Sequence, residues 1–146
     1  MTRKLCVMLI AIFCALPTFA QDVAAMKAKA EAGDAAAQVD LALEYILGSV
    51  VPKDINKGIE LLQKADKQGN VEAPFYLANL YWKGWDVPQD YKKAFSLYSK
   101  AAAQGHAESQ YHLGLMYEKG LGVAKDTAKA KELFKKAADQ GYEPPP

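Results

Sequence analysis

A six-residue motif returns at a fixed interval along this chain, and this regularity constrains the fold more than any other feature. The run KAAAQG ends at Gly105, returns as KAADQG ending at Gly141, and has a divergent copy, KADKQG, ending at Gly69. Successive copies are 36 residues apart, and another glycine, Gly33, stands 36 residues before the first copy. A period of this length is typical of a stacked array in which each unit covers the exposed face of the next.

Each unit is predicted to hold two helices joined by a loop. In the first block, positions 37, 38, 41, 42 and 45 share one helical face, and positions 58, 61, 62 and 65 share another. Glycine can adopt the left-handed conformation that ends a helix, and it recurs after each first helix at Gly48, Gly84 and Gly120. Aspartate caps helix N-termini and recurs before each second helix at Asp54, Asp90 and Asp126. The glycines of the six-residue motif are then expected to end the second helices.

Small and aromatic residues also recur in register and predict the core. Small side chains that let neighbouring helices approach closely stand at Ala42, Ala78, Gly114, Ala65, Ala101 and Ala137. The repeated tyrosines, Tyr45, Tyr81 and Tyr117, are expected in the core as well.

These residues are similar to those of the Sel1-like repeat, a relative of the tetratricopeptide repeat. The block Ala107–Gly141 resembles the family pattern over nearly its whole length, and Ala73–Gly105 also matches. The resemblance implies an all-α fold, namely a right-handed α-α solenoid of three 36-residue helix-turn-helix repeats. It also implies that the first helix of each unit lines the concave side of the curve.

Three departures from the family pattern affect the local geometry of the first two units. Gly58 stands where alanine is usual, and Asp66 and Lys67 replace an alanine pair. Pro74 takes the place that glutamine holds in the other two units, and only the third loop keeps both glycines, at Gly120 and Gly122.

The first twenty residues have the order of a secretory signal peptide. Arg3 and Lys4 precede an apolar run over residues 5–16, and small residues then lead to Ala20. We expect cleavage after Ala20 and export to the periplasm, with secretion as the second choice. A permanent membrane anchor is the alternative, although the apolar run is short for one. Lipid attachment at Cys14 is a further alternative, but the bulky Phe13 precedes that cysteine.

Charge and cysteine usage narrow the class of function. Both cysteines, Cys6 and Cys14, lie in the segment expected to be removed, so the mature chain would have no disulfide. Loss of Arg3 and Lys4 leaves 16 basic against 17 acidic residues. Because there is no excess of basic residues, we do not expect the mature chain to bind nucleic acid, or to bind a membrane stably after the signal is removed.

These signals divide the chain into six parts. They are a signal peptide (1–20), a capping helix (21–32), three Sel1-like repeats (33–68, 69–104 and 105–141) and a proline-rich tail (142–146). Val23 and Met26 lie in phase with core positions of the repeats, which predicts a cap over the first unit. Nothing helical follows the third unit, so the side of Leu133 and Phe134 is expected to be partly open. We therefore expect a monomer, or weak self-association through this end.

No catalytic, cofactor-binding or metal-binding set is visible in the expected mature chain. Its two histidines, His106 and His112, are six residues apart and have no cysteine nearby to complete a zinc set. We expect both to be exposed or groove-lining polar residues. The glycine-containing loops recur in every unit, which marks them as connectors and not as phosphate-binding loops.

Candidate partner-binding residues form a stripe on the first helices, beside the core face. Positions spaced i, i+4, i+7 and i+11 share this stripe. They read Ala36, Asp40, Leu43 and Leu47, then Glu72, Tyr76, Asn79 and Lys83, then Glu108, His112, Leu115 and Lys119. The alternative is a plain solvated surface with Leu43 and Leu115 as additional core.

The middle unit adds an aromatic group at one helix end. Trp82 and Trp85 replace non-aromatic residues of the neighbouring units, and Phe75 and Tyr76 stand in the same helix as Trp82. Exposed tryptophan and tyrosine are common anchors of protein interfaces. Two alternatives stay open: both indoles could cover the join between units, or they could stack on a sugar.

The sequence therefore predicts a non-enzymatic protein-binding module, and the resemblance implies an adaptor or regulator of an envelope complex or sensor. The alternative is an immunity protein that neutralises a toxin or secretion-system effector in the periplasm. A remote alternative is an enzyme, because cysteine-rich relatives have been credited with β-lactam binding or hydrolysis. The cysteine framework of those relatives is absent here.

Overall fold

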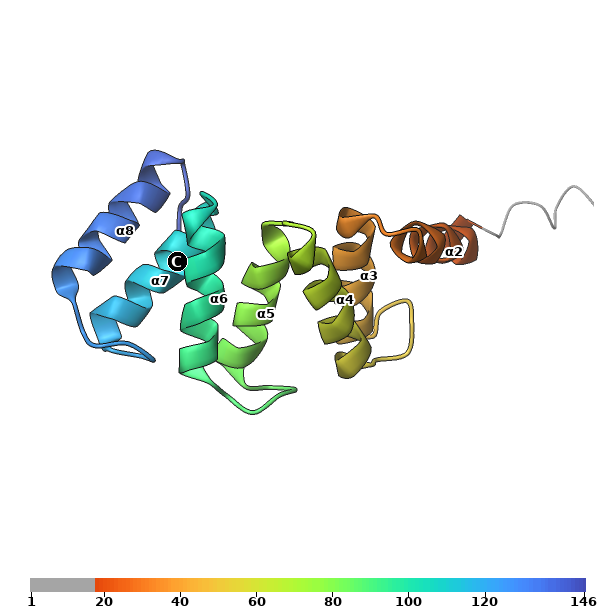
Figure 1. Cartoon of the computed structure of the whole chain (residues 1–146), viewed down its shortest axis with the longest axis horizontal. Coiled ribbons are helices and arrows are strands. Elements are labelled where there is room, and N and C mark those ends of the chain that lie inside the picture. The colour runs from red at the N-terminus through yellow and green to blue at the C-terminus, as the bar shows by residue number, and fades with distance from the viewer. Residues whose placement is uncertain (1–17) are drawn as a thin grey trace, which may run out of the picture.

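The computed structural model describes residues 18–146, which form a row of antiparallel helix pairs (Figure 1). A single helix, α2 (Thr18–Glu31), precedes the pairs. The pairs are α3 (Ala35–Leu47) with α4 (Ile55–Lys67), α5 (Glu72–Lys83) with α6 (Tyr91–Ala103), and α7 (Ala107–Lys119) with α8 (Thr127–Asp139). The described residues contain seven helices and no strand, so the predicted all-α solenoid of three 36-residue repeats is confirmed.

The recurring glycines and aspartates set the helix ends as the spacing predicts. Gly48, Gly84 and Gly120 end the first helices with φ angles of 71°, 65° and 68°. Each second helix starts where an aspartate carboxylate accepts a hydrogen bond from the backbone N–H three residues later. The donors are the N–H groups of Lys57, Lys93 and Lys129, at 2.9 to 3.0 Å. Each repeat thus carries its own start and stop signals.

Three clusters of buried side chains join the helix pairs into one stack. The first lies between α2 and the first repeat, where Val23 and Met26 of α2 pack against a core that includes Leu41 and Tyr45. The second joins the first and second repeats around Leu62 and Leu77. The third joins the second and third repeats around Tyr98 and Met116. Because every cluster spans a junction, each repeat depends on its neighbour for burial, and α2 caps the first repeat.

The N-terminal predictions fall largely outside the described residues. The expected signal peptide is not described before residue 18, and α2 begins at Thr18, so it includes Ala20 and starts three residues before the predicted cap. Cleavage after Ala20 stays a prediction.

The C-terminal end is more closed than the sequence suggests. Leu133 is 9% exposed, and Phe134 packs against Tyr111 with ring centroids 5.3 Å apart. Tyr142, from the predicted tail, also packs against Tyr111, with ring centroids 5.4 Å apart. The first residue of the tail therefore shields the surface that a fourth repeat would cover.

Candidate functional site

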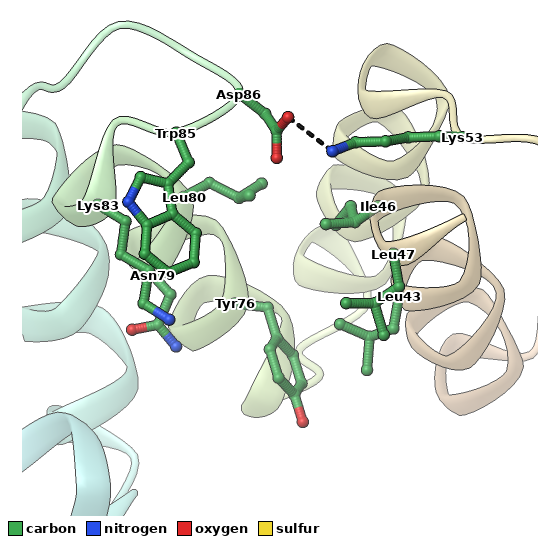
Figure 2. A pocket seen from close by; sticks show the side chains of 10 residues that line it. All are labelled: Leu43, Ile46, Leu47, Lys53, Tyr76, Asn79, Leu80, Lys83, Trp85 and Asp86. Carbon is green, nitrogen blue, oxygen red and sulfur yellow. Dashed lines mark ion pairs between the residues drawn. The ribbon is translucent and has the colours of Figure 1, made fainter. Parts of the chain in front are cut away.

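A groove of about 470 Å³ lies between the first helices of the first two repeats, and we call it the α3–α5 groove (Figure 2). Helix α3 forms one wall, α5 forms the other, and the loops that follow these helices form one end. The lining residues are Leu43, Ile46, Leu47, Lys53, Tyr76, Asn79, Leu80, Lys83, Trp85 and Asp86.

The size of one side chain distinguishes this junction from the next. Ile46 of α3 and Trp82 of α5 occupy equivalent positions, 36 residues apart. The Trp82 ring packs edge-on against Tyr91, Tyr98 and His112, with centroids 5.4, 6.2 and 6.1 Å away. Trp82 thus fills the space beside α7, whereas the smaller Ile46 leaves space beside α5.

Two large apolar side chains are exposed in the described residues, and both line the α3–α5 groove. Leu47 is 71% exposed and Trp85 is 80% exposed. They come from different repeats, and Figure 2 shows Leu47 on α3 opposite the indole of Trp85. The Lys83 ammonium lies 4.7 Å from the centroid of the Trp85 ring, a cation–π contact that holds the exposed indole beside α5.

An ion pair links the two repeats at the loop end of the groove. The Lys53 Nζ atom lies 2.8 Å from Asp86 Oδ1, across the junction (Figure 2). Both side chains are partly exposed, so the pair contributes about 0 to 1 kcal/mol to stability. It joins the loop after α3 to the loop after α5.

The hydroxyl of Tyr76 lies near the acidic side of the groove. Burial raises the pKa of Tyr76, and the carboxylates of Glu72, Glu108 and Asp40 raise it further. These carboxylates come from α5, α7 and α3, so the first helices of three successive repeats contribute negative potential to one edge of the stripe. The predicted site residues Asp40, Glu72 and Glu108 therefore act on the same side of the molecule.

Other predicted site residues belong to the core between the second and third repeats. Phe75 is only 6% exposed. Asn79 lines the groove, but its Oδ1 atom accepts a hydrogen bond of 2.5 Å from the hydroxyl of the buried Tyr98. His112 stacks on the Tyr98 ring at 5.1 Å with an interplanar angle of 10°. Phe75 and most of His112 are thus unavailable to a partner.

His112 is a core histidine, which corrects the expectation of an exposed or groove-lining residue. Its side chain is 21% exposed, and its Nδ1 atom is buried and has no hydrogen-bond partner within residues 18–146. Burial, together with the smaller effects of the nearby charges of Lys83 and His106, lowers the pKa of His112 to about 4. The ring is therefore neutral at pH 7.

His106 has a structural role that the sequence reasoning missed. Its Nδ1 atom accepts a hydrogen bond of 3.1 Å from the backbone N–H of Ser109, so it caps the N-terminus of α7. Asp34 caps α3 in the same way, and Asn70 accepts from the N–H groups of Glu72 and Ala73 at the start of α5. The 36-residue spacing of the three capping residues was the signal that could have identified this role.

The structure brings together only part of the predicted partner-binding set. Tyr76, Asn79, Lys83 and Trp85 line the α3–α5 groove, while Trp82 packs at the next junction. Lys119 is exposed at the end of α7, outside the groove lining. Trp82 therefore covers a junction between repeats, as the alternative predicts, whereas Trp85 does not.

Three lining residues are not among the site residues that the sequence predicts, namely Ile46, Lys53 and Asp86. Leu47 is predicted only as one member of the stripe. The available signal was Leu47 itself, because lysine occupies the equivalent position in the other two repeats. The ion pair of Lys53 and Asp86 had no sequence signal, since the two residues are not in equivalent positions.

A metal centre and a membrane-spanning helix are two further features to consider in residues 18–146. In that range, histidine, cysteine, aspartate and glutamate side chains do not gather in a group of three that could hold a metal ion. None of the helices described there has the length and apolar character needed to cross a membrane.

Paired antiparallel helices repeated every 36 residues define an α-α solenoid, and the chain belongs to the Sel1 repeat family. The Sel1 repeat model matches three times, over residues 35–70, 71–106 and 107–142. Sel1 repeat proteins are generally protein–protein interaction modules, and their fold is typically a non-catalytic scaffold that binds protein partners.

Three solved structures are similar to this chain. A Sel1 repeat protein from Oxalobacter formigenes is 39% identical, with a TM-score of 0.76, covering 84% of this chain and 92% of that one. The protein c5321, a protective antigen of uropathogenic Escherichia coli, is 38% identical with a TM-score of 0.79. That match covers 82% of this chain but only 26% of the longer E. coli protein.

The third structure is Helicobacter pylori cysteine rich protein B. It is 24% identical, with a TM-score of 0.66, covering 86% of this chain and 90% of that chain, and it shows the shared fold alone. No curated protein matches the sequence.

Proposed function

We propose that this protein is a protein-binding module exported to the periplasm of a Gram-negative bacterium, where it acts as an adaptor or regulator of an envelope complex or sensor. The order of charged, apolar and small residues over positions 1–20 supports export. The proposed binding site for the partner is the α3–α5 groove.

The observation that carries this proposal is the location of Leu47 and Trp85. Monomeric proteins seldom gather exposed large apolar side chains in one concave place unless that place binds something. Tryptophan is also among the residues that contribute most to protein interfaces. Here the two exposed apolar side chains of the described residues face one groove from two repeats.

The groove is organised before a partner arrives. Its walls are helices with buried inner faces, and the Lys53–Asp86 ion pair links its loop end. A rigid surface loses little conformational freedom on binding, which favours affinity.

The test compares the two tryptophans in a tagged full-length chain that is crosslinked to its neighbours in the periplasm. We expect Trp85→Ala to lose partner capture with no change in helicity, since the indole is exposed. Trp82→Ala should instead lower the free energy of unfolding by about 2 kcal/mol or more, because it removes packed aromatic contacts. If Trp85→Ala captures the same proteins in the same yield as the wild type, the proposed function of the groove is wrong.

The identity of the captured protein separates the adaptor from the immunity protein. An adaptor or regulator should capture envelope proteins, and its deletion should change envelope composition or signalling in the absence of any toxin. Capture of one lethal effector encoded beside this gene, with a phenotype only when that effector is present, would support the immunity protein instead.

A further inference from the structure

We propose that the α3–α5 groove binds an amphipathic helix of its partner, antiparallel to α3 and α5. This helix carries acidic side chains near its N-terminus and basic side chains near its C-terminus. The inference rests on the proposed function, because it names the kind of segment that the groove takes.

The lining of the groove favours a helix over an extended segment. Four of the ten lining residues are aliphatic, namely Leu43, Ile46, Leu47 and Leu80, and the rings of Tyr76 and Trp85 add to the apolar surface. An extended segment buried there would leave backbone N–H and C=O groups without hydrogen bonds, which is costly. The described residues offer no strand edge to pair with, and the Asn79 side-chain oxygen already accepts from Tyr98. A helix satisfies its own backbone and can bury an apolar face against such a wall.

The two ends of the groove carry opposite charge. Glu72 lies in the first turn of α5 and Asp40 lies near the middle of α3, and after burial both carboxylates contribute to the raised pKa of Tyr76. Lys83 lies at the C-terminal end of α5, and its ammonium is held over the exposed ring of Trp85. A partner that fills the groove therefore meets negative charge at one end and, at the other, the positive charge of Lys83 beside the Lys53–Asp86 ion pair, which has no net charge.

Helix stabilisation within the protein explains only part of this charge order. An acidic residue in the first turn and a basic residue in the last turn stabilise their own helix, which accounts for Glu72 and Lys83. Asp40 lies in the middle of α3, is exposed, and gains nothing from that effect. Its carboxylate adds to the negative end of the groove.

The charge order sets the direction and spacing of the partner helix. Glu72 and Lys83 are 11 residues apart, which is about 16 Å along α5, or three helical turns. A partner helix matches this spacing with charges at positions i and i+11 on one face and apolar side chains at i+4 and i+7. The antiparallel direction places acid at its N-terminus and base at its C-terminus, which also stabilises an isolated helix.

The test uses displayed peptides of about 16 residues on a helix-forming background, since shorter helices are marginal in water. Four positions on one face, i, i+4, i+7 and i+11, are randomised, and binders are selected on the purified protein. We expect Asp or Glu at i, large apolar residues at i+4 and i+7, and Lys or Arg at i+11. A peptide with the two charges exchanged should bind about fivefold more weakly.

A charge-reversed protein provides the matched control. The double variant with Glu72→Lys and Lys83→Glu should select the opposite charge order. Because the exchange also removes favourable charges from the ends of α5, its helicity is measured beside that of the wild type. The opposite order with the wild-type protein, the absence of any order, or the absence of enriched peptides would each overturn the inference.

Binding of the same peptides to the Trp85→Ala variant tests the charge-ordered helix separately from docking in the groove. If binders show no charge order but are lost in Trp85→Ala, the charge-ordered helix is wrong while docking in the groove stands. If Trp85→Ala changes neither peptide binding nor periplasmic capture, the proposed function falls as well.

Discussion

At the scale of single residues, Gly122 shows how a missing side chain brings two repeats together. Its φ angle is 70°, and a Cβ atom added there would lie 2.6 Å from the carbonyl carbon of Tyr91 in the preceding repeat. Because the obstacle is backbone, no side-chain rotation could relieve it. The loop after α7 can approach the start of α6 only if this residue is glycine.

We expect Gly122→Ala to lower the free energy of unfolding by about 3 kcal/mol or more, from left-handed strain plus the backbone clash. Gly105→Ala is the matched control, since Gly105 has a φ of 87° and nothing within 4 Å of an added Cβ. That control should lose only about 1 to 2 kcal/mol, the cost of the left-handed conformation. Urea unfolding measures both variants, and equal losses would show that the loop contact does not matter.

His112 makes stability depend on pH. Its pKa is about 4 in the folded protein and roughly 6.5 in an unfolded chain. Below pH 6.5 the His112 side chain is protonated in the unfolded chain but stays neutral in the folded chain. The stability that this residue contributes is therefore complete above pH 6.5 and is lost as the pH falls to 4. The loss is about 3 kcal/mol.

We expect His112→Tyr to remove most of this pH dependence, since Tyr76 occupies the equivalent position in the second repeat. The measurement is urea unfolding of both proteins at pH 7 and pH 4.5. His106 also has a pKa lowered by burial and contributes in the same direction, so the difference between the two proteins isolates His112. An unchanged pH dependence in the variant would contradict this assignment.

At the scale of helices, a pair of glutamines ties the two helices of a repeat together. Gln68 donates to the side-chain oxygen of Gln38 at 2.8 Å, and Gln140 donates to that of Gln110 at 2.8 Å. Gln38 and Gln110 in turn donate to backbone carbonyls of the preceding helix. In the second repeat Pro74 replaces the central glutamine, so this link is missing there.

Gln140→Ala should therefore lower the free energy of unfolding by about 1 kcal/mol, because it leaves the partly buried Gln110 side chain with one partner fewer. Gln104→Ala, at the equivalent position beside Pro74, should change it by less than about 0.5 kcal/mol. Thermal unfolding of the two variants side by side is sufficient. A larger effect at Gln104 than at Gln140 would refute the role of the pair.

The helices and their ends could be predicted because their signals are local and repeat. The glycines and aspartates that end and start helices depend only on nearby backbone, and the 36-residue register identified them. The departures in the first repeat depend on contacts between repeats, which sequence does not show. Asp66, for example, forms an ion pair of 2.5 Å with Lys100 of the next repeat.

The candidate site was predicted only in part, for the same physical reason. Six predicted residues line the groove, counting Leu43 and Leu47 of the stripe, but exposure depends on how repeats meet. Trp82 and Trp85 are three residues apart and looked alike in the sequence, yet one packs at a junction and the other is 80% exposed. Their separation follows from the end of α5 at Lys83, which places Trp85 in the loop.

At the scale of the whole molecule, the two junctions between repeats differ in what their first helices leave open. Trp82 fills the space between α5 and α7, whereas Ile46 leaves the groove between α3 and α5. Gly58 lies against Ile46, and a Cβ atom added at Gly58 would meet Ile46 Cγ1 at 2.6 Å, so Ile46 already fills the space that the missing side chain leaves. The open junction therefore follows from the size of the residue at position 46 and not from a separate domain or cavity.

Filling the α3–α5 groove with a larger side chain tests most directly whether the partner docks there. Ile46→Trp copies the second repeat into the first, and Glu118→Trp adds the same ring at the equivalent exposed position of the third repeat. With helicity and unfolding temperature checked in both, we expect Ile46→Trp to lose periplasmic partner capture and Glu118→Trp to keep it. Full capture by a folded Ile46→Trp protein would contradict docking in the α3–α5 groove.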